Sequence, residues 1–288
     1  MTVDNLLSEE GQFEASLMEN GIPPCPAALK AIGAELQKND PDIHILEQAI
    51  STDVAIAGGV LRTVNSPVFG LQNKVRSVLQ AVQVLGLRST TQVVACVALR
   101  TAFSGAQLER FWESSAKIAW LSAWLVVNRR WRGVRADEAY TFGLFRDVGI
   151  PILLQRMPDY VDVLKMANAS PNHAFTEFEK SLIPVSHAHV GAMLTRAWWL
   201  PEEICNGIAH HHEVEAISPA CIFVGLAPSS SSLIAISQVA EYFYQRATGL
   251  CATREWDKLG SACMERLELG ESDLENLQKE AEAALADM

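Results

Sequence analysis

The segment Gly143-Leu144-Phe145-Arg146-Asp147-Val148-Gly149 lies near the middle of this 288-residue chain and decides how the rest of it is interpreted. Three further segments follow it in order, namely His187-Ala188-His189-Val190-Gly191-Ala192, Trp199-Leu200-Pro201 and His211-His212-Glu213. Around them, apolar residues recur at the three- and four-residue spacing of amphipathic helices, and we find no convincing run of alternating strand segments bounded by turns. The sequence therefore predicts an all-α protein.

Prolines, glycines and capping residues divide the chain into helices, because proline favours the first helical turn and glycine the end. In the first third, the expected signals are Pro24-Cys25-Pro26 before a helix, Asp40-Pro41 with proline at the first helical position, Thr52 or Asp53 as a cap, Ser77 with capping-box spacing to Gln80, a stop at Gly86, and a buried helix from Arg88 to Phe103. Later helices are expected at Leu108 to about Arg130, Ala136 to about Gln155, Tyr160 to Asn168, near Phe175, near Val185, at Pro201, Leu233 to Ala247 and Glu271 to Ala286.

Three segments of the first third carry a further pattern: Ile22-Pro23-Pro24-Cys25-Pro26, Val64-Asn65-Ser66-Pro67-Val68-Phe69-Gly70, and Ser77-Val78-Leu79-Gln80-Ala81-Val82-Gln83-Val84-Leu85-Gly86. Together with the four central segments they resemble HDOD domains, over about residues 15 to 245. The resemblance implies an all-helical fold related to the HD-domain metal phosphohydrolases. It also implies a regulatory or scaffolding role in bacterial signal transduction.

The same resemblance predicts how the chain is divided. We expect an N-terminal segment over 1–14, the N-terminal helical lobe of an HDOD domain over 15–104, an HD-like helical lobe over 105–248, and a C-terminal helical extension over 249–288. In the extension, Leu274, Leu277, Ala281 and Leu285 recur among acidic residues. This spacing predicts an amphipathic helix that packs against another part of the protein.

HD hydrolases hold one or two metal ions with histidines and aspartates, and the resemblance maps the main ligand positions onto this chain. The early histidine position falls on Ser114, the His-Asp pair reads Arg146-Asp147, and the late aspartate falls near Glu241. Serine is a poor neutral ligand, and arginine cannot give up its proton, so it places a fixed positive charge where a cation would sit. We therefore expect no catalytic residue and no metal, with Arg146 or another nearby base paired to Asp147.

Histidines leave a metal alternative open. His187, His211 and His212 match positions of the family, whereas His189 and His210 are additional. Imidazoles bind zinc, iron or manganese, but adjacent residues on a helix diverge by about 100°, so His210, His211 and His212 cannot all face one ion. The simpler interpretation is that one or two of these rings are buried and hydrogen-bonded to fix helix packing.

Composition limits the partners. The formal net charge of −11 repels phosphate backbones, and the helix after Gly86 is too apolar to lie in a DNA groove, so we expect no nucleic-acid binding. The stretch from Ala216 to Ala240 lacks charge, but Pro228 and the serines after it interrupt it, so we expect no membrane span. Six scattered cysteines indicate reduced thiols and a cytoplasmic location.

Three functions remain. The one that we favour is a non-catalytic signalling module that contacts other signalling proteins through an apolar groove or through its C-terminal helix. The second is a metal-dependent phosphohydrolase or phosphodiesterase that acts on a nucleotide. The third is a sensor that binds a small anion at Ser114, Arg146, Asp147, His187, His211, His212 and Glu241. Motifs of P-loop, dinucleotide-binding and serine-hydrolase proteins do not occur in the sequence, and the oligomeric state stays open.

Overall fold

The computed structural model describes residues 3–66, 71, 73–103, 108–131, 133–171, 173–221, 223–250 and 253–286. Within them the chain forms helices and no strand, which confirms the predicted all-α class. The helices are α1 Val3–Asn20, α2 Ala27–Leu36, α3 Ile43–Ser51, α4 Val54–Val64, α5 Val78–Ala102, α6 Glu109–Arg129, α7 Ala136–Phe145, α8 Gly149–Arg156, α9 Tyr160–Ala169, α10 Phe175–Lys180, α11 His187–Ala197, α12 Glu202–Ala209, α13 Val214–Ile217, α14 Pro228–Thr248, α15 Glu255–Arg266 and α16 Glu271–Ala286.

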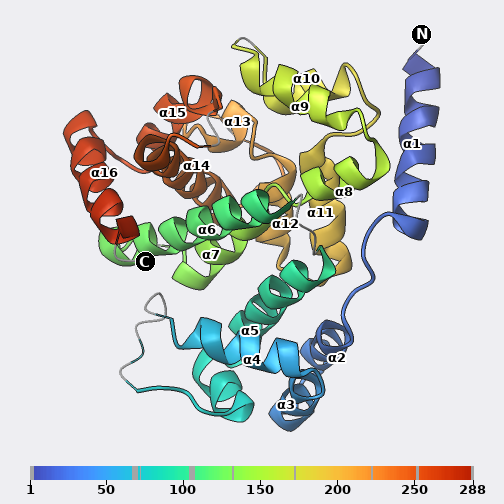
Figure 1. Cartoon of the computed structure of the whole chain (residues 1–288), viewed down its shortest axis with the longest axis vertical. Helices are drawn as coiled ribbons and strands as arrows, with labels where there is room; N and C mark the ends of the chain where they lie inside the picture. Colours follow the sequence, from blue (N-terminus) through green and yellow to red (C-terminus); the bar gives the residue numbers. More distant parts are fainter. Residues whose placement is uncertain are drawn as a thin grey trace.

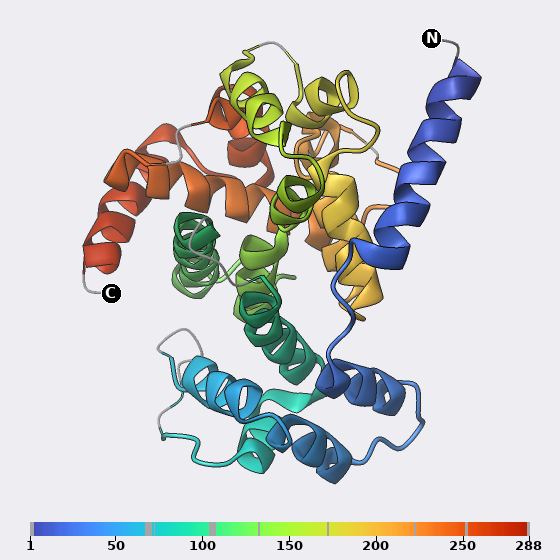
Figure 2. The same cartoon turned by 45° about the vertical axis from the view of Figure 1, so that its right-hand side comes forward.

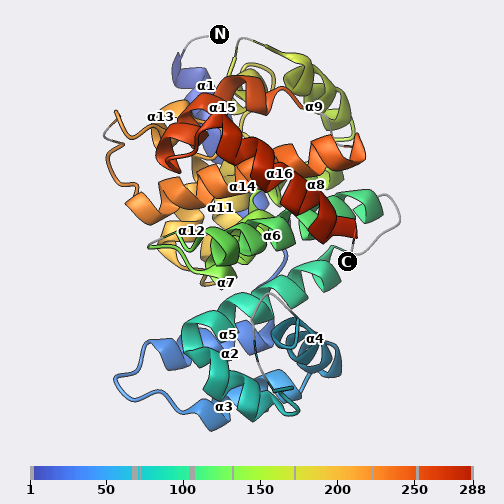
Figure 3. The same ribbon diagram turned by 90° about the vertical axis from the view of Figure 1, so that its left-hand side faces the viewer.

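Two lobes are visible in Figures 1 and 3. Helices α2, α3 and α4 pack around the first part of α5 in the smaller lobe, and the rest of α5 runs up to α7 in the larger lobe. Gly86 breaks α5 with a φ of 74°, as the sequence predicts. The predicted lobe boundary at residues 104 and 105, and Pro67 to Gly70 of the Asn-Ser-x-x-Phe-Gly pattern, lie outside the described residues.

Helix α5 is also the one helix of the described chain that is long and apolar enough to cross a membrane. Its most apolar window is 61% buried inside the protein, and Gly86 interrupts it. These features are typical of a core helix that joins two lobes. The expected interruption of the uncharged stretch from Ala216 to Ala240 is present, because α13 ends at Ile217 and α14 begins only at Pro228. The helix start expected at Leu233 is five residues too late, because proline fits the first helical turn, where no backbone N–H is needed.

Side-chain caps set several helix starts. Asp53 caps α4 through the N–H groups of Ala55 and Ile56, as predicted. The predicted start at Pro41 is wrong by two residues, because the Asp42 side chain accepts from His44 N–H and α3 begins at Ile43. Ser77 accepts from Gln80 N–H, but the Gln80 side chain accepts from Arg76 N–H, so the box is shifted by one residue.

The predicted helix from Ala136 to Gln155 is broken in two. Helix α7 ends at Phe145 and α8 begins at Gly149, with the turn Arg146–Val148 between them. A Cβ atom on Gly149 would lie 2.0 Å from the backbone oxygen of His187, so α8 and α11 meet backbone to backbone. The break therefore places Arg146 and Asp147 on a turn that faces the first turn of α11.

Helices α1, α13 and α15 were not expected, and all three belong to the larger lobe. Helix α1 lies beside α11 (Figure 2). The side chain of Glu14 on α1 pairs with His189 on α11 at 2.7 Å, and Leu17 of α1 is buried. Helix α15 packs on α14. The predicted amphipathic helix α16 is confirmed, and its Leu277 and Ala281 are buried with α14 beneath them.

The cysteines are free thiols wherever they are described. Cys96, Cys205 and Cys263 are buried and Cys25 is half-buried, in line with their apolar sequence surroundings, whereas Cys221 is exposed. Cys251 lies outside the described residues.

Candidate functional site

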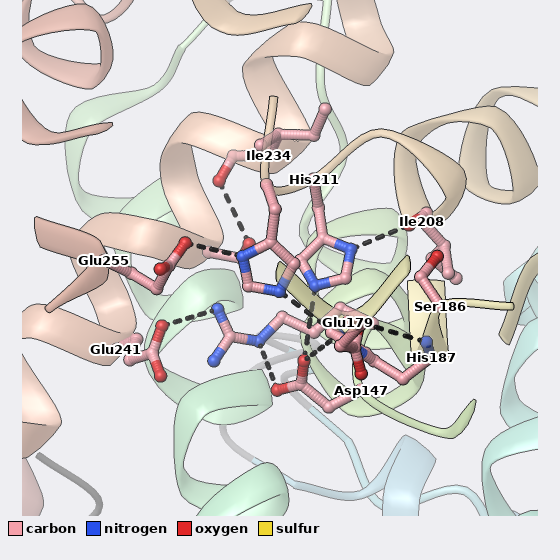
Figure 4. Close-up of polar contacts among 12 residues, drawn as sticks. Asp147, Glu179, Ser186, His187, Ile208, His211, Ile234, Glu241 and Glu255 are labelled. Atoms are coloured by element: carbon pink, nitrogen blue, oxygen red, sulfur yellow. Dashed lines mark hydrogen bonds and ion pairs between the residues drawn. The ribbon is translucent and has the colours of Figure 1, made fainter. Parts of the chain in front are cut away.

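A buried guanidinium lies at the centre of the site. Arg146 is 2% exposed, and its Nη1 lies 3.0 Å from Oε2 of Glu241 on α14. Its Nε lies 3.1 Å from Oδ2 of Asp147, as an ion pair without hydrogen-bond alignment (Figure 4). The predicted pairing of Arg146 with Asp147 is therefore present, and Glu241 supplies a second carboxylate. One fixed cation is held between two acids.

These charges act on one another strongly because solvent is largely excluded. Burial alone would raise the pKa of Asp147, but the charge of Arg146 and the neighbouring His187 and His211 rings hold it well below its usual range. For Glu241 burial prevails, and its pKa is raised despite Arg146. Burial disfavours the charged form of Arg146, yet both carboxylates raise its pKa, so the guanidinium keeps its charge.

His187 opens α11 and points toward Asp147. Its Nδ1 donates to Oε2 of Glu179 at 2.8 Å, and its Nε2 lies 3.6 Å from Oδ1 of Asp147. Glu179 is itself fully buried and also accepts from the Tyr160 hydroxyl. Burial lowers the pKa of His187, but the Glu179 charge outweighs it and raises the pKa to about 10. Glu179 thus fixes the orientation of the ring.

His211 and His212 follow the end of α12. Nδ1 of His211 donates to the backbone oxygen of Ile208 at 2.7 Å, and its Nε2 lies 3.3 Å from Oδ1 of Asp147. Burial, and then the neighbouring His212, lower the pKa of His211 to about 4, so this ring is neutral. Nδ1 of His212 donates to Oε2 of Glu255 at 2.6 Å.

Four ligand atoms converge as a result. Atoms of Asp147, His187, His211 and His212 that can each bind a metal all lie within 4.8 Å of one another. Each imidazole uses Nδ1 to bond a fixed acceptor, which leaves Nε2 toward the common centre, the arrangement that outer-sphere partners impose on metal-binding histidines. Three imidazole nitrogens and one carboxylate fit a single transition-metal ion such as zinc or iron.

The helical-divergence argument does not apply to two of the adjacent histidines. Helix α12 ends at Ala209, so His211 and His212 occupy a turn, and a ring nitrogen of each faces the common centre. His210 points elsewhere and pairs with Glu213, while His189 pairs with Glu14. All three inward rings are buried, more than the one or two expected.

The other ligand positions that the resemblance implies do not form a second metal site. Ser114, on α6, lies in the same cavity, and its hydroxyl is 3.3 Å from that of Tyr244. Arg146 fills the space between Asp147 and Glu241 with a permanent cation. The residues present therefore fit one ion and do not fit a dinuclear centre.

A cavity of about 320 Å³ leads to the site. It is lined by Arg110, Phe111, Ser114, Arg146, Asp147 and Glu241 among others, and by two of the three histidines. Sequence reasoning did not find Glu255, which starts α15 and bonds His212. No local motif marks that glutamate, since it comes to the site from 43 residues away.

Comparisons with a family model and with solved structures both lead to HDOD domains. The family model of the HDOD domain matches residues 22–214. A solved HDOD domain protein of unknown function from Geobacter sulfurreducens has a TM-score of 0.66 at 20% identity, and the match covers 99% of this chain and 96% of that one. A protein named "Putative phosphohydrolase" from Shewanella amazonensis SB2B has a TM-score of 0.64 at 19% identity, covering 96% and 92%.

One curated relative, an uncharacterized protein of Treponema pallidum (strain Nichols), is 26% identical over 195 residues. The match covers 67% of this chain but 38% of that relative. The structural similarities, at these identities, establish the shared fold.

Proposed function

Because this chain belongs to the HDOD family, we propose that it is a signal-transduction module that does not hydrolyse phosphate esters and that keeps a site for one metal ion. The family resemblance supports the regulatory role. The pairing of Arg146 with Asp147 and Glu241 supports the loss of chemistry, and the converging histidines support the single ion.

The position of Arg146 carries the non-catalytic part of the proposal. Two-metal hydrolysis needs a pair of cations that share a carboxylate and clamp the attacking and leaving oxygens. Here one oxygen of Asp147 faces the histidines and the other faces the guanidinium of Arg146. Arginine supplies charge but no open coordination position and no acidic water, so it cannot replace the second metal.

Asp147, His187, His211 and His212 would hold the single ion. When bound, the ion would supply positive charge and a link between the α7–α8 turn, α11 and the turn after α12. The residues around it keep their own tasks, since Glu179 and Glu255 orient two of the imidazoles. This proposal revises the expectation of no metal, which rested on Ser114, Arg146 and Glu241.

The sensor alternative is less well supported. An incoming anion would have to compete for Arg146 with Asp147 and Glu241, which already lie within 3.1 Å of it. Glu255 adds another carboxylate to the same cavity. The balance of charge around the guanidinium therefore disfavours an anion there.

We also propose other signalling proteins as partners and a cytoplasmic location, supported by the acidic composition and the free thiols. Contact through the apolar stripe of α16 is disfavoured, because Leu277 and Ala281 are buried. A partner would have to contact another surface. We therefore expect a chain truncated at residue 270, which lacks α16, to retain its partner in a pull-down.

Hydrolysis of bis(p-nitrophenyl) phosphate and of p-nitrophenyl phosphate, with Mn²⁺, Fe²⁺ or Zn²⁺ added, tests the catalytic part. We expect the wild-type rate to equal that of Asp147→Ala and of buffer. A variant that combines Ser114→His, Arg146→His and Glu241→Asp restores the implied ligands and serves as the reference for a rebuilt site. Turnover by the wild type that Asp147→Ala abolishes would refute the proposal.

A further inference from the structure

A second cavity lies away from the histidines, where the two lobes meet. It has a volume of about 470 Å³ and is lined by residues of α4, α5 and α7, with α5 packed against each of the other two helices (Figures 1 and 3). Gly59 brings α4 close to α5, because a Cβ there would lie 2.4 Å from a methyl carbon of Val97. The cavity is thus part of the helix packing between the lobes. Its size is in the range of small-molecule sites.

The charges of this cavity are all positive. Arg62 comes from α4 and Arg100 from α5, and no carboxylate lines the cavity within the described part of the chain. Both arginines are exposed, so they lie at the mouth of the cavity, and neither forms an ion pair in the described residues, although acids outnumber bases in this chain by 34 to 23. Two unpaired guanidinium groups in an acidic protein form a local site of attraction for an anion.

Neutral donors lie beside the two arginines. Tyr140 reaches the cavity from α7, and its hydroxyl has no hydrogen-bond partner among the described residues. Burial raises the pKa of Tyr140 to about 12, although nearby Arg100 lowers it, so the hydroxyl stays protonated and able to donate. Thr63 adds a second hydroxyl. Guanidinium and hydroxyl donors from three helices match the several oxygens of a phosphate group.

We propose that the cavity among α4, α5 and α7 binds a small phosphate ester of nucleotide size, with Arg62 and Arg100 on the phosphate and Tyr140 donating to it. A free phosphate would leave most of the volume empty, while the apolar part of the lining, including Val97 and Leu144, suits an organic group. The site is separate from the histidine cluster and does not depend on its function. Because Leu144 lies two residues before Arg146, an occupant would contact the helix that leads to the other site.

Both arginines could also have a purely structural role, which the experiment must distinguish from phosphate binding. Each lies in the last turn of its helix, where a cation stabilises the helix end. That role predicts a small loss of stability on substitution and no effect on any ligand. Arg156 is a matched control, since it is exposed in the last turn of α8 and does not line the cavity.

Isothermal titration calorimetry of the full chain with adenosine 5′-monophosphate, and with adenosine alone, tests the proposal. We expect the monophosphate to bind and adenosine to bind at least tenfold more weakly. Arg62→Ala and Arg100→Ala should each raise Kd about tenfold or more, the usual effect of losing a charged hydrogen bond. Tyr140→Phe should raise it severalfold, and Arg156→Ala should leave it unchanged.

Circular dichroism of each variant establishes that it is folded before it is titrated. The proposal is overturned if no heat is seen with millimolar monophosphate, if adenosine binds equally well, or if Arg156→Ala weakens binding as much as the other two arginine variants. A phosphoserine peptide that binds where the monophosphate does not would also overturn it, because the site would then serve a protein partner.

Discussion

Nε2 of His187 lies 3.1 Å from Nε2 of His212, while Nδ1 of each ring is bonded to a buried glutamate. Two neutral imidazoles in these tautomers would point lone pairs at each other. A proton or a metal ion must therefore lie between them. The charge of Glu179 raises the pKa of His187 to about 10, which favours a proton in the metal-free protein, and a cation that displaces it would bind three nitrogens and Asp147.

The first prediction concerns metal stoichiometry. We expect elemental analysis after loading with Zn²⁺ or Fe²⁺ to find a single equivalent per chain. His187→Ala should abolish binding, and Glu255→Gln, which removes an outer partner of His212, should weaken it about 10- to 100-fold. His210→Ala is the control, since His210 pairs with Glu213 outside the cluster. Two equivalents in the wild type would show that Arg146 does not exclude the second ion.

The second prediction concerns the buried ion triad. Arg146→Met leaves Asp147 and Glu241 without their cation, and we expect it to lower the free energy of unfolding by about 3 kcal/mol in urea titrations. Adding Glu241→Gln should recover part of that loss, because one buried charge is then removed. Arg156→Ala should change stability by less than about 0.5 kcal/mol. Equal stability of Arg146→Met and the wild type would mean that the guanidinium is not needed to balance the carboxylates.

A third prediction follows from an unpartnered amide in α5. Gln92 is fully buried, and neither its Nε2 nor its Oε1 has a hydrogen-bond partner. Replacing such a group by an apolar one of similar size removes an uncompensated desolvation cost. We expect Gln92→Met to raise the unfolding free energy by about 1 kcal/mol. Gln83→Met, at an exposed position of the same helix, should have almost no effect, and a destabilised Gln92→Met protein would reveal a missing partner such as bound water.

Thiol reactivity provides the fourth prediction. Burial raises the pKa of Cys205 to about 11 and that of Cys96 to about 12, so at pH 8 about one Cys205 thiol in a thousand is ionised. Iodoacetamide at pH 8 should modify exposed Cys221 and leave both buried thiols intact, as peptide mass spectrometry can show. Raising the pH should increase labelling of Cys205 before that of Cys96. Rapid labelling of Cys96 at pH 8 would indicate that α5 opens locally.

The sequence predicted most of the helices because their signals are local. Asp53, Gly86 and the limits of α16 follow from caps, glycine and apolar spacing, and the structure has them where they were expected. The turn after Phe145 was missed, because its cause is contact with α11, whose backbone reaches Gly149 from 38 residues away. Tertiary contacts of this kind leave no periodic signal.

The functional site, too, could be predicted from the sequence only in part. The family resemblance located Ser114, Arg146, Asp147, His187, His211, His212 and Glu241, and the structure brings them to one cavity or its edge. The inward direction of both His211 and His212 could not be predicted, since it depends on α12 ending at Ala209. Glu255 escaped prediction because a single glutamate at a helix start is ordinarily solvated, and only the packing of α15 on α14 brings it to His212.

The guanidinium between Asp147 and Glu241 also affects how stable the fold is when metal ions are scarce. A metal-bridged core loosens when a chelator or a starving cell withdraws the ion. Arginine is covalently attached and ionised at every physiological pH, so this half of the larger lobe carries its own permanent counter-ion. The fold around α7, α8 and α14 should therefore persist in metal-depleted medium. Only the cluster of His187, His211 and His212 would change when the ion is lost.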